Sequence, residues 1–85
     1  MEKINIGLVD DQLLFRQGMA ALIGSVEGFS LVMEADNGEN CLSRLAELEN
    51  RPDILLMDME MPGIDGMQLN EILHKRFPSV KVIVV

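Results

Sequence analysis

Four short apolar segments, separated by longer amphipathic ones, are the feature of this 85-residue chain that most constrains its fold. The apolar segments are rich in β-branched and aliphatic residues, which favour strands. Each spacer is long enough to hold a helix and far longer than a hairpin turn, so the strands are expected to be parallel and joined by crossovers. The predicted strands are Ile4–Val9, Leu31–Ala35, Ile54–Met57 and Val80–Val85.

Each spacer carries apolar residues at helical intervals. The buried face of the first predicted helix comprises Leu14, Phe15, Gly18, Met19, Leu22 and Ile23. That of the second comprises Cys41, Leu42, Leu45 and Leu48, and that of the third Met67, Leu69, Ile72 and Leu73. Gly24 is expected to end the first helix. Asp65 and Gln68 predict a capping box at the start of the third, which should end before Pro78.

This order of elements predicts an α/β fold with a doubly wound parallel sheet. Ile54–Met57 is apolar without interruption, so it is expected at the centre of the sheet with both faces covered. The chain stops directly after its fourth strand, which leaves Val82–Val85 as an apolar edge. We therefore expect residues 1–85 to be the N-terminal part of a larger domain.

The charge balance excludes several classes of partner. Fourteen acidic against 7 basic residues give a net charge of −7, the wrong sign for a protein that binds phosphate backbones. One cysteine, Cys41, cannot form an internal disulfide, and the N-terminus runs directly into a strand rather than a leader segment. No segment approaches the roughly 18 apolar residues of a membrane span. We expect a cytoplasmic protein that binds neither nucleic acid nor membrane through this segment.

Carboxylates follow the first and third predicted strands. Asp10 and Asp11 come after the first, and Asp58 and Glu60 after the third. In parallel sheets ligands bind at the carboxyl ends of strands, where these residues would meet. Their repulsion, about 4 kcal/mol for each pair at about 4 Å in an effective dielectric of about 20, calls for a neutralising ion. Mg²⁺ prefers oxygen ligands, so the pattern predicts a magnesium site that accepts a phosphoryl group.

Three motifs together carry a resemblance to a known family. Val9–Asp11 closes the first predicted strand, Leu56–Asp58 closes the third, and Met61–Gly66 leads into the third helix. From Ile4 to Val85 the chain resembles the receiver domain of two-component response regulators. The resemblance implies a flavodoxin-like fold with strand order 2-1-3-4, here incomplete, since the last helices and the fifth strand would be absent.

Two further segments refine this resemblance. Arg16–Met19 and Glu34–Gly38 are most similar to the subgroup with a LuxR-type helix-turn-helix output, although Gln12 stands where that subgroup usually has His. We expect residues 1–85 to include no output domain, and to lack the Ser or Thr and the Lys with which, by this resemblance, the family contacts the phosphoryl group.

The resemblance also implies roles for individual residues. Asp58 would be the phosphoacceptor, receiving its phosphoryl group from a histidine kinase. Asp11 and Asp58 would ligate Mg²⁺ or Mn²⁺ directly, with Asp10 acting through a water and the backbone carbonyl of Glu60 as a further ligand. The site loop would comprise Met59, Met61, Pro62 and Gly63.

The four acidic residues, His74 and Cys41 also have simpler interpretations, in which they have no role in a functional site. Asp10 and Asp11 alone are typical of a solvated helix N-terminus, and Asp58 alone of a turn after a strand. The side chain of Glu60 either tunes dephosphorylation or is a plain exposed acid. His74 suits the last turn of a helix, where cations complement the dipole, and Cys41 suits the core.

Two alternative functions remain open. Asp58–Glu60 loosely resembles the nucleophile motif of haloacid-dehalogenase-type hydrolases, but those enzymes carry it on their first strand. Repeated turnover of a phosphomonoester would distinguish such an enzyme from a receiver. The other alternative is a structural fragment that does not switch and forms a homodimer through its exposed strand, Val80–Val85.

Overall fold

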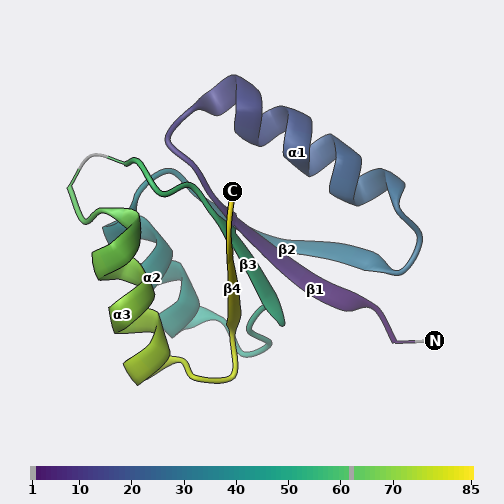
Figure 1. Ribbon diagram of the computed structural model, residues 1–85. Helices are drawn as coiled ribbons and strands as arrows, with labels where there is room; N and C mark the ends of the chain where they lie inside the picture. The colour runs from purple at the N-terminus through teal and green to yellow at the C-terminus, as the bar shows by residue number, and fades with distance from the viewer. Residues whose placement is uncertain (1, 62) are drawn as a thin grey trace.

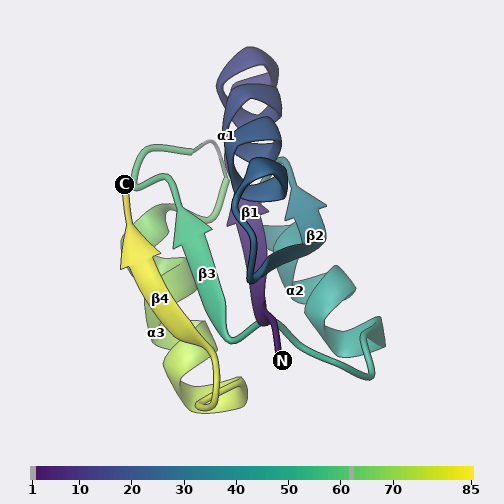
Figure 2. The same ribbon diagram turned by 90° about the vertical axis from the view of Figure 1, so that its right-hand side faces the viewer.

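The computed structural model describes residues 2–61 and 63–85, which form one parallel sheet with helices on both faces. The elements in chain order are β1 (Ile4–Val9), α1 (Leu13–Ser25), β2 (Phe29–Ala35), α2 (Gly38–Glu47), β3 (Ile54–Met57), α3 (Gly66–Arg76) and β4 (Lys81–Val84). The strands lie in the order β2-β1-β3-β4, and Figure 2 shows that their arrows point the same way. This confirms the predicted α/β fold, its doubly wound parallel sheet and the strand order 2-1-3-4.

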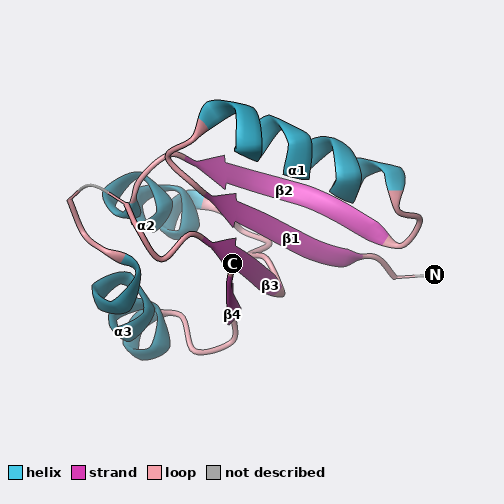
Figure 3. Ribbon diagram, turned by 45° about the horizontal axis from the view of Figure 1, so that its top comes forward, coloured by secondary structure: helices cyan, strands magenta, loops and turns pink. Residues whose placement is uncertain are grey.

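The helices divide unequally between the faces of the sheet. The helices α2 and α3 cover one face, and α1 lies on the other (Figures 1 and 3). The core under α2 and α3 comprises Val9, Met33, Ala35, Cys41, Leu45, Leu55, Met57, Met61, Leu69, Leu73, Phe77 and Val80. The core under α1 is smaller and has Ile6, Leu8 and Ile23 at its centre. In the part of the chain that the structure describes, no helix is long and apolar enough to cross a membrane.

The helix α1 turns only part of its apolar surface toward the sheet. Ile23 is buried, and Met19 and Ala20 are partly buried against the side chains of β1. The exposed members of the predicted face are Leu14, Phe15, Gly18 and Leu22. An α-helix turns about 100° per residue, so the stripe through Leu14 and Leu22 points roughly 100° away from the one through Met19 and Ile23. The prediction of a single buried face was therefore wrong.

Strand β3 is interior, but only one of its faces is fully buried. Leu55 and Met57 lie in the core under α2 and α3 and are 0% exposed. Ile54 and Leu56, on the opposite face, are only partly buried. Among the described elements α1 lies over β1 and β2, and Leu56 of β3 is only partly buried against the core under α1. The expectation that both faces are covered was therefore wrong.

The predicted helix stop at Gly24 was also wrong. The helix continues past it, and the N–H of Val26 caps it by donating to the carbonyl of Ile23 at 3.2 Å. The chain reverses at Gly28, whose φ of +97° is strained for residues with a side chain. β2 starts at the next residue, two residues before its predicted start.

The start of α3 confirms the predicted capping box. The Asp65 side chain accepts from the Gln68 N–H at 2.9 Å, and the Gln68 side chain accepts from the Asp65 N–H at 3.3 Å. Leu69 and Leu73 form the buried face as predicted, each 0% exposed. Met67 is 66% exposed, so its predicted place on that face was wrong. It lies in the first turn of α3 and lines an open hollow with Met59 and Glu60.

Strand β4 is the apolar edge that the sequence predicts. It spans Lys81–Val84, one residue less at each end than predicted, and it pairs with β3. Within the described residues it is the last strand of the sheet. Ile83, Val84 and Val85 are 48%, 43% and 59% exposed.

Close packing at Gly7 in β1 generates a stability prediction. A Cβ at this position would lie 2.9 Å from both Leu55 Cδ1 and Met33 Cγ. Gly7→Ala is expected to lower the free energy of unfolding by about 1–3 kcal/mol, because the added methyl group overpacks the core. Urea denaturation measures this change.

Gly18→Ala is the matched control for Gly7→Ala. A Cβ there would meet nothing within 4 Å, and Gly18 lies inside an exposed helix. This variant is expected to gain about 0.5–1 kcal/mol, since alanine restricts the unfolded chain and favours the helix. Equal stability of the two variants would contradict the packing argument.

Burial of Cys41 in α2 generates a pH prediction. Desolvation in the core raises the pKa of its thiol from 9.0 to about 12. Between these values the unfolded chain has lost the proton and the folded chain keeps it, so the unfolded state binds fewer protons. The free energy of unfolding should therefore fall as pH rises from 9.0 toward about 12. Urea denaturation across this range should show a shallower fall for Cys41→Ala, and equal slopes would contradict the assignment.

Candidate functional site

The site begins with the pairing of β1 and β3. Val9 lies opposite Met57 at the carboxyl ends of these strands. The N–H of Asp58 donates to the Val9 carbonyl at 3.0 Å, and the N–H of Asp10 donates to the Ala35 carbonyl of β2 at 3.1 Å. Asp10 and Asp58 therefore leave neighbouring strands at the same edge of the sheet.

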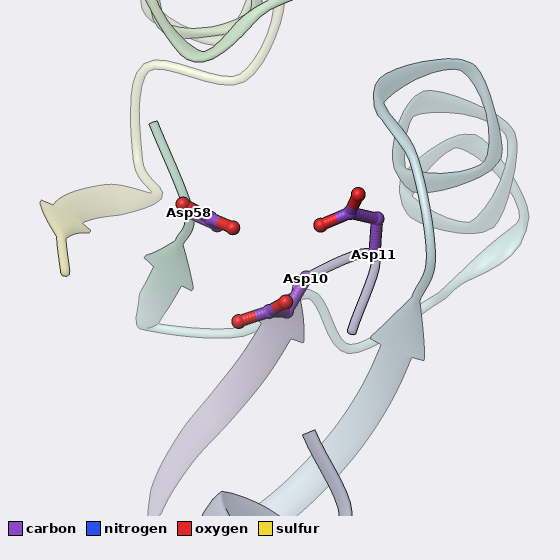
Figure 4. A group of neighbouring side chains, drawn as sticks. All are labelled: Asp10, Asp11 and Asp58. Carbon is purple, nitrogen blue, oxygen red and sulfur yellow. The ribbon is translucent and has the colours of Figure 1, made fainter. Parts of the chain in front are cut away.

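Three of the predicted site residues meet at this edge. Asp10, Asp11 and Asp58 each place one carboxylate oxygen so that all three oxygens lie within 4.8 Å of one another. Figure 4 shows the carboxylates of Asp11 and Asp58 facing each other, with Asp10 at the end of its strand. Asp10 is 7% exposed, Asp58 is partly buried and Asp11 is exposed.

The burial of Asp10 contradicts its interpretation as a solvated residue at a helix N-terminus. Its Oδ1 accepts from the N–H of Gln12 at 2.8 Å, which closes a local turn. The N-cap of α1 is Gln12, and its side chain makes no capping hydrogen bond. Asp10 is therefore fixed by the end of β1 and by this turn rather than by capping α1.

The Arg16 side chain on α1 also contacts this turn. Arg16 Nη1 donates to the backbone carbonyl of Asp10 at 2.6 Å, and its Nε lies 3.5 Å from Glu34 Oε1 on β2. Sequence reasoning included Arg16 only in a family motif and missed this contact. The six-residue separation of Arg16 from Asp10 is a weak signal of this contact. A long side chain in the first turn of a helix can reach back to the end of the preceding strand.

Asp58 is oriented by the loop that follows it. The N–H of Glu60 donates to Asp58 Oδ1 at 3.1 Å, so the backbone turns back toward the carboxylate. The Glu60 side chain is exposed. This turn places the Glu60 backbone beside the Asp58 carboxylate.

The loop that leads into α3 depends on close backbone packing. Gly66 is buried, and its N–H donates to the Met59 carbonyl at 3.0 Å. A Cβ on Gly66 would lie 2.7 Å from Met59 Cα, a distance that forces the backbone to move. Gly63 adopts a φ of +81°, which favours glycine. Met61 is in the core at 8% exposure, and Met59 is 39% exposed. The predicted role of Pro62 lies outside the described residues.

The donor set fits a hard divalent cation. Three carboxylate oxygens at one edge carry negative charge that a cation would offset, and Mg²⁺ takes oxygen ligands. An open hollow beside them is lined by Asp10, Gln12, Phe15, Asp58 and Val85. The arrangement can hold a cation and leaves room on one side for a small anionic group.

Two other reactive side chains lie away from this edge. His74 is exposed in the last turn of α3, beside Lys75 and Arg76. Cys41 is 0% exposed in the core under α2, as the sequence predicts. Neither residue belongs to the group of carboxylates.

Comparison with known proteins identifies relatives of the chain. The family model of the response regulator receiver domain matches residues 6–85. The chain is 42% identical over 82 residues to response regulator GacA of Pseudomonas aeruginosa, covering 96% of this chain and 37% of that protein. It is 39% identical over 83 residues to the transcriptional regulatory protein DegU of Brevibacillus brevis, covering 98% and 34%. The chain thus spans about a third of the length of these relatives.

Solved structures have the same fold. The RcsB response regulator of Salmonella typhimurium is 26% identical and superposes with a TM-score of 0.87 over 99% of this chain and 42% of that one. The isolated receiver domain of RcsB from Salmonella enterica, determined with the phosphomimetic BeF₃⁻, has the same identity and TM-score over 98% and 61%.

Proposed function

The chain belongs to the response regulator receiver domain family, and from this premise we propose that it accepts a phosphoryl group on Asp58. The observation that carries the proposal is the meeting of Asp10, Asp11 and Asp58 within 4.8 Å at the carboxyl edge of the sheet. The position of Asp58 also supports it, because this residue follows the interior strand β3 and lines an open hollow.

Asp58 is the best nucleophile of the three. Its Oδ1 accepts from the Glu60 N–H, and its other oxygen has no hydrogen bond to residues 2–61 and 63–85. Asp10 is buried and held by the Gln12 N–H. Asp11 is exposed and points across at Asp58. These differences in burial and exposure support the proposal that Asp58 attacks the phosphorus atom and that Asp10 and Asp11 help to hold the cation.

Asp11 and Asp58 would hold Mg²⁺ or Mn²⁺ directly, with Asp10 acting through a water and the Glu60 carbonyl as a further ligand. When bound, the cation supplies neutralisation of the charge on the transferring phosphoryl oxygens. The chain supplies position: the main-chain hydrogen bonds to Asp10 and Asp58 keep the carboxylates in place before the donor arrives. Without a cation, three negative charges would repel the phosphoryl group.

The proposed donor is the phosphohistidine of a histidine kinase. An Asp58 oxygen attacks the phosphorus atom as the bond from phosphorus to the histidine nitrogen breaks. That nitrogen keeps the electron pair and takes a proton from water. The product is an acyl phosphate on Asp58, with no change of oxidation state.

We further infer that the phosphoryl group controls an output elsewhere in a longer protein. The relatives include a protein named as a transcriptional regulator, and this chain spans about a third of it. A LuxR-type DNA-binding output, suggested by Arg16–Met19 and Glu34–Gly38, is part of the proposal. Residues 1–85 would then be the N-terminal part of the receiver domain. The cytoplasmic location expected from the sequence stays a prediction.

Labelling by a small acyl-phosphate donor tests the phosphoacceptor. The intact mass of the chain, measured after incubation with Mg²⁺ and the donor, is expected to increase by one phosphoryl group. The Asp58→Asn variant should gain none, since an amide is too weak a nucleophile to replace the carboxylate. Removal of the divalent cation with a chelator should abolish labelling of the wild-type chain.

Asp36→Asn is the matched control for Asp58→Asn. Asp36 is also an aspartate that directly follows a strand, but it is exposed after β2 and outside the group of three carboxylates. This variant should be labelled like the wild type. Labelling that persists in Asp58→Asn, or none in the wild type, would overturn the assignment. Repeated release of phosphate from a phosphomonoester would indicate a hydrolase instead.

A second candidate function is self-association through Val80–Val85. It is favoured by the exposure of Ile83, Val84 and Val85 at the edge of the sheet. Pairing of two β4 edges would cover these side chains and satisfy backbone groups.

The mass of the chain by light scattering tests this candidate and is expected to rise from monomer toward dimer with concentration. Ile83→Glu should shift the equilibrium toward monomer because it places like charges at the paired edge. Leu22→Glu, a change of equal chemistry at an exposed leucine on α1, should leave the equilibrium unchanged. A monomer at all concentrations would contradict the candidate.

A further inference from the structure

We propose that Arg16 is a positioning residue for the acidic group: oriented by Glu34, it holds the carbonyl of Asp10 and thereby directs Asp11 toward Asp58. The inference rests on the proposed function, because the direction of Asp11 matters when these carboxylates share a cation. It concerns the protein's own hydrogen bonds, which exist without any ion.

The contacts of Arg16 join three elements. The residue lies in the first turn of α1, its Nη1 donates to the Asp10 carbonyl at the end of β1, and its Nε lies 3.5 Å from Glu34 Oε1 on β2. The hydrogen bond to Asp10 is short, 2.6 Å, and the Arg16 side chain is only 16% exposed. A charge-assisted hydrogen bond shielded from water in this way is stronger than a neutral or solvated one.

The Asp10 carbonyl is the group through which Arg16 acts. The first hydrogen bond of α1 runs from the Arg16 N–H to the Gln12 carbonyl at 2.9 Å, so the Asp10 carbonyl precedes the helical ladder. The peptide that joins Asp10 to Asp11 is planar. Holding its oxygen therefore fixes the direction in which the Asp11 backbone leaves the strand.

Asp11 is the member of the group that most needs such support. Asp10 is buried and held at its N–H by Ala35 and at its carboxylate by Gln12. Asp58 is held at its N–H by the end of β1 and at its carboxylate by the following loop. Asp11 is exposed, so its direction depends on the peptide before it.

Arginine suits this role better than lysine. Its planar guanidinium presents donors in two fixed directions, which here meet a carbonyl and a carboxylate. A lysine ammonium carries the same charge at one point and lacks the fork. Arg16→Lys therefore separates the geometry of the contact from its charge.

The experiment compares Arg16→Lys with the wild-type chain. The affinity of the variant for Mg²⁺, measured by titration of the folded chain, is expected to be about tenfold or more below that of the wild type. Replacing residues that orient metal ligands has effects of this size in other proteins. Without metal, the backbone amide NMR signals of Asp11 and Gln12 are expected to shift or broaden. A purely structural role would lower the free energy of unfolding and leave the Mg²⁺ affinity of the folded variant unchanged.

Two further variants sharpen the comparison. Glu34→Gln keeps the shape but loses the charge that orients Arg16, so its affinity is expected to fall in the same direction by a smaller factor. Arg44→Lys is the matched control: Arg44 lines the same groove as Arg16 and Glu34, but its Nε donates to Asn40 Oδ1 within α2 at 2.8 Å. Its affinity and the Asp11 amide signal should match the wild type.

The outcomes distinguish the positioning role from the proposed function. The positioning role predicts that the Mg²⁺ affinity of Arg16→Lys falls about tenfold or more. An affinity within about twofold of the wild-type value overturns it. If the wild-type chain binds no Mg²⁺ and is not labelled at Asp58, the proposed function fails. The metal-free amide signals then still decide the inference: an unchanged Asp11 signal in Arg16→Lys overturns the positioning role, and a changed one supports it.

Discussion

The parallel pairing of β1 with β3 is the interaction on which the candidate site depends. Val9 lies opposite Met57, and the hydrogen bond from the Asp58 N–H to the Val9 carbonyl continues the ladder past the ends of both strands. Asp10 and Asp58 are therefore neighbours by register. A slip of one residue would turn one strand's side chains to the other face, exposing Val9 or Met57, which are 1% and 0% exposed. The burial of the core and the meeting of the carboxylates are thus set by the same register.

The concentration of negative charge at this edge opposes folding, and main-chain hydrogen bonds limit its effect. Asp10 accepts from the Gln12 N–H, and Asp58 accepts from the Glu60 N–H. These donors stabilise the carboxylates in fixed positions, while the large core under α2 and α3 offsets the remaining repulsion. A cation bound at the proposed site would offset this negative charge and stabilise the folded chain. The proposed transfer of a phosphoryl group to Asp58 is consistent with a site whose carboxylates the backbone positions in advance.

Sequence patterns predicted two strands and one helix cap correctly, missed the ends of other elements by one or two residues, and failed for the face of α1 that packs on the sheet. Ile4–Val9 and Ile54–Met57 were predicted to the residue, and the capping box at Asp65 is a contact between residues three apart. The face of α1 was mispredicted because periodicity shows where apolar residues lie on a helix, not how wide a strip its sheet covers. For the site, the sequence identified all three carboxylates that meet, because a residue after a parallel strand has a known edge. It missed the contact of Arg16 with Asp10, which depends on the angle between α1 and the sheet.

The sequence by itself indicated the strands, their parallel arrangement and the presence of Asp10, Asp11 and Asp58 at one edge, because strand and helix periods are local and crossovers that hold a helix favour parallel pairing. Only the tertiary structure decided that Asp10 is buried while its neighbour Asp11 is exposed. It also decided that Gly66 packs against the Met59 backbone. Burial and close approach depend on which residues distant in the chain come together, and a backbone contact that leaves no room for a Cβ has no periodic signature in the sequence.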